Sequence, residues 1–537
     1  MNASSPTKQS TPRKVPGLRQ TMSDLHIWTG LLVGWILYAM FLTGTVSYFR
    51  DEISQWMRPE LAARSPVPDA AEVAQRVAGT LASLAPASPQ WNIGLPDERN
   101  NVVSVSWQNP KIPGRRGLET AVLDPASGER LNARETRGGD FFYVFHFQFH
   151  YMPVPWGRWL AGFCAMFMLV AIVSGVIVHK KIFADFFTFR WGKGQRAWLD
   201  AHNALSVLGL PFHLMITYSG LITLMLLYMP WGSDAAFKTP AERQALTAEM
   251  NVRTPPGKPS GEQAELAPVA DMVRVAQERW GRDNVGRVAI GNLGDAGARV
   301  MVVRGDGGRI SVSPQYLMFD GKSGELLQVK DRVGPAAETR GVVFALHLGR
   351  FADTTVRWLY FLVSLAGTAM VGTGLVLWTV KRRAKLPDPE HPYFSFRLVE
   401  RLNIATIAGL PLAMAAFLWG NRLLPASLTG RADWEIHLFF IAWGLTLAFA
   451  SLRPPRRAWI ELLWATAAAL ALLPLLNMLT TARGLPASLA AGDWVFAGFD
   501  LAIWAFAALA AILARRTALH KPRAVRQRAR PMAGEPA

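Results

Sequence analysis

Residues 157–179 read GRWLAGFCAMFMLVAIVSGVIVH, and this stretch decides the fold class. After Arg158 the chain carries no Asp, Glu, Lys or Arg before His179 closes the stretch. A helix that spans a bilayer needs roughly 20 consecutive, mostly apolar residues. The stretch therefore predicts a transmembrane helix with a polar residue at each end.

Seven further segments satisfy the same length rule, which gives a polytopic α-helical membrane protein of about eight spans. The third span is long and Pro211 interrupts it, so we expect a kink there. The predicted spans are 26–49, 156–180, 198–229 and 355–381, followed by four more, 399–420, 434–452, 458–480 and 493–514, in a C-terminal membrane extension over 399–514.

The composition agrees with a membrane protein. Half of the 537 residues are hydrophobic, which is too apolar for an ordinary soluble protein of this length. The net charge of +18 does not indicate nucleic-acid binding, because Lys and Arg gather beside the apolar segments. The single cysteine, Cys164, excludes a disulfide framework, an Fe–S cluster and covalently attached haem. A redox metal would need His, Met or carboxylate ligands.

Basic residues predict the orientation. They concentrate in the tails 1–25 and 515–537 and in the turns after the second, fourth and sixth spans. With eight spans, all five segments fall on one side, which is cytoplasmic by the positive-inside rule. We expect no cleavable signal peptide, because the polar, basic start leads into a first span long enough to remain in the membrane. The sequence therefore predicts a bacterial inner-membrane protein with both termini in the cytoplasm.

Two long polar inserts, 50–155 and 230–350, are then periplasmic, and they resemble each other. Each has a helix (70–84; 269–280), an alternating strand (102–105; 300–303) and a closing Asp-x-x-Ser-Gly-Glu sequence (124–129; 320–325). Such a sequence predicts a tight turn in which Asp starts the turn and Gly takes a positive φ. A calcium site is the alternative, but it requires more oxygen ligands than the turn provides.

Seven of the ten histidines lie at or within the ends of the first four spans. Ligating side chains in membrane spans are costly, so they indicate a functional site, with interfacial polar residues as the alternative. His26, His179 and His202 fall at the predicted cytoplasmic ends, and His146, His150 and His347 at the periplasmic ends. The seventh is His213.

His213 follows His202 by eleven residues, so on a straight helix the two would share a face about 16 Å apart. Ligands at two depths suit two stacked haems, because haem iron takes an axial ligand on each side of the macrocycle and imidazole is a common choice. A zinc or copper site is the competing interpretation.

Short sequence blocks follow one another along the first four spans. They are LHIWTGL (25–31), FLTGT (41–45), GRWLAG (157–162), SGVIVH (174–179), HNALS (202–206), SGL (219–221), LHLGRF (346–351), RWLY (357–360) and TGLVLW (373–378). In this order the blocks resemble the PepSY-associated transmembrane proteins, over about residues 20–385. The resemblance implies an iron-regulated inner-membrane protein. It also implies a four-helix haem-bearing bundle with two periplasmic α+β PepSY-like modules, and some relatives are reductases that release iron from ferric siderophores.

The resemblance implies which histidines are metal ligands, and it ranks them. His26, His150, His202 and His347 come first, His179 and His213 next, and His146 last. Arg158 and Arg350 are candidate partners for haem propionates or for an acidic iron chelate, with snorkelling at the membrane interface as the alternative.

The chain departs from some relatives because it carries no Gly-x-Gly-x-x-Gly motif of a nicotinamide- or flavin-binding module. The electron donor is then membrane quinol or a separate reductase. The expected function is a transmembrane oxidoreductase with haem b, two per chain, that reduces a ferric siderophore or another iron(III) chelate. A non-enzymatic siderophore or haem transporter, or a periplasmic regulator, is the alternative.

Overall fold

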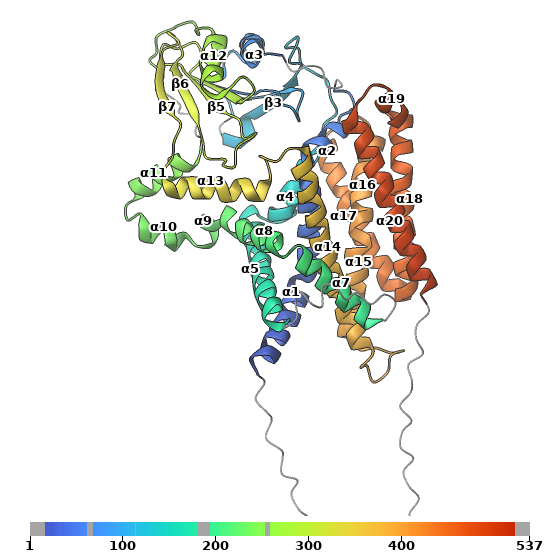
Figure 1. Cartoon of the computed structure of the whole chain (residues 1–537). Helices are drawn as coiled ribbons and strands as arrows, with labels where there is room; N and C mark the ends of the chain where they lie inside the picture. Colours follow the sequence, from blue (N-terminus) through green and yellow to red (C-terminus); the bar gives the residue numbers. More distant parts are fainter. Residues whose placement is uncertain (1–16, 62–67, 113, 180–193, 253–257, 521–537) are drawn as a thin grey trace, which may run out of the picture.

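The computed structural model describes residues 17–61, 68–112, 114–179, 194–252 and 258–520. A helical bundle carries a sheet domain at one end (Figure 1). Within the described residues, seven helices are long and apolar enough to cross a membrane. They are α1 (Leu18–Ser47), α5 (Val154–Val178), α14 (Thr354–Arg383), α15 with α16 (Phe394–Ile407 and Gly409–Leu423), α17 (Arg431–Leu452), α18 (Pro455–Thr480) and α20 (Trp494–Leu519).

One further pair of helices passes the same test when taken together, and would make an eighth span. Helices α7 (Gln195–Leu208) and α8 (Leu210–Thr223) meet at Gly209 and are bent by 69° relative to each other. Pro211 lies in the first turn of α8. Backbone N–H groups in the first turn of a helix have no partner within the helix, so the missing N–H of proline costs nothing there. The predicted kink is confirmed. The straight-helix estimate for His202 and His213 is wrong, because the two residues lie on opposite sides of the bend.

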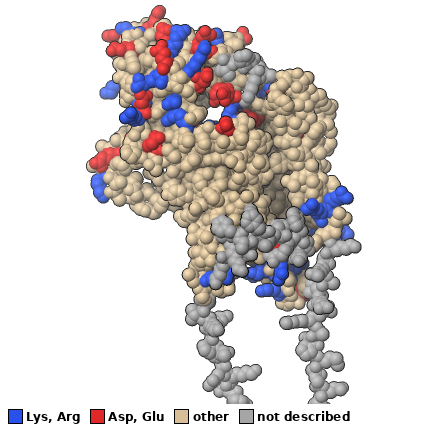
Figure 2. All heavy atoms as spheres, in the orientation of Figure 1, with Lys and Arg blue, Asp and Glu red and all other residues tan. Residues whose placement is uncertain are grey.

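The surface of the bundle is apolar between two charged ends. Figure 2 shows acidic and basic side chains over the sheet domain, a wide band without them, and basic side chains at the far end of the helices. Large apolar residues of the long helices are exposed, such as Trp156 of α5, Leu362 of α14 and Leu445 of α17. A bilayer would cover them, since its hydrocarbon core is about 30 Å thick. The protein is therefore a multi-pass membrane protein, as predicted.

The two inserts form one antiparallel sheet of seven strands in the order β3-β2-β1-β4-β5-β6-β7. The first supplies β1 (Gln90–Gly94), β2 (Val103–Gln108) and β3 (Leu118–Leu123), with a 3-10 turn, η1, at Gly114–Gly117. The second supplies β4 (Val285–Gly291), β5 (Arg299–Arg304), β6 (Tyr316–Asp320) and β7 (Leu326–Lys330). Since β1 pairs with β4 along its whole length, the two inserts make a single domain.

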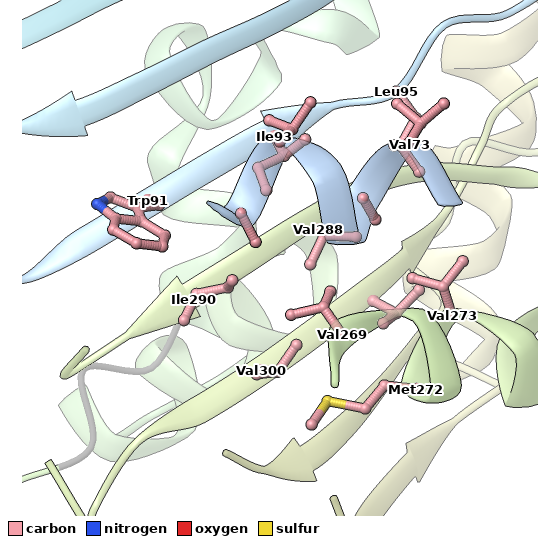
Figure 3. Close-up of a cluster of buried hydrophobic side chains, with 14 of the residues drawn as sticks. Val73, Trp91, Ile93, Leu95, Val269, Met272, Val273, Val288, Ile290 and Val300 are labelled. Carbon is pink, nitrogen blue, oxygen red and sulfur yellow. The ribbon is translucent and has the colours of Figure 1, made fainter. Parts of the chain in front are cut away.

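Two helices cover this sheet, α3 (Ala70–Leu84) and α12 (Val269–Trp280), each with the predicted bounds. Their apolar faces pack on residues of the two central strands, such as Ile93, Val288 and Ile290, which are fully buried (Figure 3). Both Asp-x-x-Ser-Gly-Glu turns are present, with φ of 75° at Gly128 and 76° at Gly324. In both turns the Asp side chain accepts hydrogen bonds from backbone N–H groups.

Each insert ends on a helix that packs back into the bundle. Helix α4 (Asp140–Gln148) packs on α1 and α5, and α13 (Pro335–Leu348) packs on α8. Short helices complete the chain: α2 (Arg50–Trp56), α9 (Met225–Tyr228), α10 (Pro230–Ala236), α11 (Pro240–Met250) and α19 (Leu485–Ala490).

Candidate functional site

Two histidines face each other at the end of the bundle away from the sheet domain. His26 on α1 and His202 on α7 have ring centres 6.1 Å apart, with their planes at 70°. His26 Nδ1 bonds the carbonyl of Ala171 at 2.8 Å, and His202 Nδ1 bonds that of Met370 at 2.9 Å. Because a carbonyl only accepts, each neutral ring carries its proton on Nδ1 and keeps a lone pair on Nε2.

A second facing pair lies at the end near the sheet domain. His146 on α4 and His347 on α13 have ring centres 6.2 Å apart, at an interplanar angle of 36°. His146 Nδ1 bonds the carbonyl of Met40 at 2.6 Å. His347 Nδ1 lies 3.0 Å from the hydroxyl of Ser219, and the ring also hydrogen-bonds the backbone of Ile216. In both pairs, therefore, Nδ1 of each ring has a hydrogen-bond partner.

One local arrangement holds all four rings. Each ring meets a carbonyl that lies four residues before a glycine, and a Ser or Thr just before that glycine donates to the same carbonyl. A Cβ on the glycine would lie between 2.7 and 3.2 Å from Cε1 of the ring, so it would force the ring beside Gly44 to move and would crowd the other three rings. The four sets are Met40, Thr43 and Gly44 for His146; Ala171, Ser174 and Gly175 for His26; Ile216, Ser219 and Gly220 for His347; and Met370, Thr373 and Gly374 for His202.

His150 does not join His347, which corrects the order inferred from the sequence. Its ring stacks on Phe440 at 5.6 Å and contacts Tyr151 at 4.4 Å. The reason is local: α4 ends at Gln148 and Phe149 takes a φ of 59°, so the chain leaves the helical path before His150. His146, ranked last from the sequence, occupies the position expected for His150.

Two further predicted ligands lie apart from the pairs. His179 caps the end of α5, and its Nε2 is 2.9 Å from the side-chain amide of Asn203. His213 is buried beside Gly209 and Gly367 and contacts the ring of Phe41. Gly367 precedes Gly374 by two turns of α14, or about 10 Å, which places His213 between the two pairs in depth.

The two predicted arginines both have partners within the protein. Arg158 donates to the side chain of Gln148, at 3.0 and 3.2 Å, and Arg350 forms an ion pair with Asp306 at 2.8 Å. Arg357, a weaker sequence candidate for the same role, pairs instead with Glu52 on α2. Arg99 pairs with the same carboxylate, and the sequence did not indicate this contact. Burial alone would raise the pKa of Glu52, but the two guanidinium groups outweigh it and lower that pKa.

Comparisons with known proteins agree with the resemblance seen in the sequence. The family model of the PepSY-associated TM region matches residues 23–381, which include all four paired histidines. The uncharacterized protein PA4219 of Pseudomonas aeruginosa is 26% identical over 327 residues, covering 56% of this chain and 76% of that protein. The family match ends before α15, so the C-terminal extension lies outside it.

Proposed function

We propose that this protein, which belongs to the PepSY-associated TM region family, is a transmembrane haem-b oxidoreductase that passes electrons across the inner membrane to a periplasmic iron(III) chelate. The observation that carries the proposal is the presence of two facing histidine pairs at two depths of the bundle. The alternative of a mono-metal zinc or copper site explains neither the pairing nor its repetition.

The spacing of the rings fits two imidazoles that would hold one haem between them. Two metal–nitrogen bonds of about 2 Å each, together with the two ring radii, separate the ring centres by roughly 6 Å. The measured separations are 6.1 and 6.2 Å. His26 and His202 would hold one haem, and His146 and His347 the other. When bound there, haem supplies reversible one-electron chemistry between ferric and ferrous iron.

The chain's own residues prepare both sites. The carbonyl bonds to Nδ1 orient each ring and direct the Nε2 lone pair to the ligand position, as outer partners of metal-bound histidines do. Met40, whose carbonyl holds His146, follows His26 by 14 residues on α1, so the pairs lie about 21 Å apart along that helix. This distance covers most of the hydrocarbon core. His213 and Phe41 lie between them.

The arrangement of the domains supports transfer toward the sheet domain. The sheet domain lies at the end of the bundle that holds His146 and His347 (Figure 1). Basic side chains mark the other end (Figure 2), which is cytoplasmic by the positive-inside rule. In this proposal both termini are cytoplasmic, and the sheet domain faces the periplasm, where a ferric siderophore or a similar chelate is reduced and releases ferrous iron. The electrons come from quinol or a separate reductase.

The purified full-length protein tests the proposal. We expect a reduced-minus-oxidised spectrum of b-type haem and two haems per chain by the pyridine haemochrome assay. A colourless, haem-free preparation from a haem-replete host would refute it. In cells, His202→Ala should stop iron release from the siderophore while the protein remains inserted. Unchanged iron use by this variant would favour the transporter or regulator instead.

A further inference from the structure

A small cavity lies where the C-terminal extension meets α14, near the end of α14 that points away from the sheet domain. Its volume is about 150 Å³. Val376, Thr379 and Val380 of α14 form one wall, and Trp459 of α18 lies across from them. This volume is below the roughly 300–1,000 Å³ of ordinary small-molecule pockets, so the cavity suits a single ring and not a whole cofactor.

The cavity and the His26–His202 pair flank α14 on opposite sides. Gly374 abuts the ring of His202. Val376 and Arg383 follow Gly374 by two and nine residues, which corresponds to rotations of about 200° and 180° around the helix. The cavity is therefore separated from the histidine pair by the thickness of one helix, about 10 Å.

Polar groups line the wall contributed by α15. Glu400 accepts a hydrogen bond from Arg383 at 2.5 Å, and both side chains border the cavity. The amide of Asn403, which is 2% exposed, donates to the carbonyl of Leu375 and accepts from the indole of Trp35 on α1. An acidic residue in a membrane span is costly unless it is paired and serves a function.

We propose that this cavity binds the ring of a membrane quinol, with its isoprenoid tail in the bilayer, and that Glu400 accepts a proton from a quinol hydroxyl. The proposal rests on the proposed function for the destination of the electrons. Oxidation of one quinol to quinone breaks two O–H bonds and releases two protons and two electrons. Glu400 passes each proton in turn to water at the cytoplasmic end. The two electrons leave one at a time toward the His26–His202 side. Their acceptor would be the ferric haem that this pair would hold under the proposed function, reduced to the ferrous state by one electron at a time.

Photoaffinity labelling tests binding without relying on activity. The full chain in nanodiscs is irradiated with a short-tailed azido-quinone, and the labelled peptides are mapped by mass spectrometry. We expect label in the peptides of α14, α15 and α18 that line the cavity, and competition by decylubiquinol. Val376→Trp fills the cavity and should lower this label about tenfold, equivalent to ~1.4 kcal/mol of binding. Leu362→Trp, at an exposed site on the same helix, should not.

A second measurement follows reduction by decylubiquinol in the absorbance spectrum. Glu400→Gln should keep the label but slow reduction about tenfold, while dithionite still reduces the protein fully. Label that falls elsewhere, is not competed by decylubiquinol or survives Val376→Trp overturns the quinol site. If the label behaves as expected but the protein holds no haem, the binding site stands and the proposed function fails. If haem is present but decylubiquinol neither competes nor reduces it, only the quinol site fails.

Discussion

His146 and His150 are four residues apart, yet only His146 reaches the second pair. We therefore expect His146→Ala and His347→Ala each to lose one of two haems, because a single remaining imidazole no longer holds the iron from both sides. His150→Ala should keep both. Haem per chain by pyridine haemochrome measures the difference. Loss of a haem in His150→Ala, with none lost in His146→Ala, would contradict the pairing.

The glycines beside the rings lead to a sharper prediction. A Cβ on Gly44 would lie 2.7 Å from both Cε1 and Nδ1 of His146, a distance that forces the ring to move. Gly44→Ala should therefore displace His146 from its bond to Met40 and lower haem content at that pair. Gly30→Ala on the same helix is the matched control, because nothing lies within 4 Å of its Cβ position. Equal haem content in both variants would show that the glycine is not required.

Most of the site could be predicted from residue types and order alone. His26, His202 and His347, chosen because ligating residues in spans are rare and serve a purpose, all lie in the facing pairs. The choice between His146 and His150 could not be made, because it depends on the positive φ of Phe149, and non-glycine residues seldom adopt that conformation. The pairing of helices that brings a distant carbonyl to each ring also has no local sequence signal.

At the scale of elements, Asp295 ties the segment before α12 to the turn between β4 and β5. Its carboxylate accepts hydrogen bonds from the backbone N–H groups of Ser260, Gly261 and Gly297. These bonds, first among them the one from Ser260, lower its pKa from 3.8 to about 2. Because the folded pKa is depressed, the stabilisation is complete above pH 3.8 and is lost as pH falls toward 2.

At neutral pH, Asp295→Asn should loosen the segment before α12 as low pH does in the unchanged protein. The reason is that an amide offers only one accepting oxygen for these donors. We expect faster amide hydrogen exchange at residues 258–264, with the rest of the sheet unchanged. Asp283→Asn, an exposed acidic residue in the same domain, is the control. Exchange that is equally fast in both variants, or unchanged in Asp295→Asn, would show that this carboxylate does not hold the segment.

The elements also show why the two inserts could be recognised but not assembled from the sequence. Their helices follow from local apolar spacing, which gave the observed bounds 70–84 and 269–280. Pairing of β1 with β4 joins residues about 200 apart, for example Ile93 with Val288. Such pairing depends on the apolar faces of both strands meeting the same two helices. A prediction from each insert alone therefore gives two modules where the chain forms one sheet.

At the scale of the whole molecule, a buried ion pair anchors the extension to the segment that leads into α4. Arg431 and Glu435 of α17 are both 0% exposed and pair with each other. Glu435 also accepts from the hydroxyl of Thr136 at 2.5 Å, and Arg431 donates to the carbonyl of Glu135 at 2.9 Å. Thr136 lies just before α4, which carries His146, so the extension helps to position one member of the second histidine pair.

Glu435→Ala should test this connection, because it leaves the Arg431 charge buried without its partner, a change that costs about 3–5 kcal/mol. We expect a lower thermal unfolding midpoint and loss of haem from the His146–His347 site, while the His26–His202 site keeps its haem. Asp433→Asn on the same helix is the control. Asp433 pairs with Arg137, but both side chains are 60% exposed, so this ion pair contributes little to stability. Equal loss at both sites would indicate general destabilisation. Selective loss would show that the extension holds the His146–His347 pair in place.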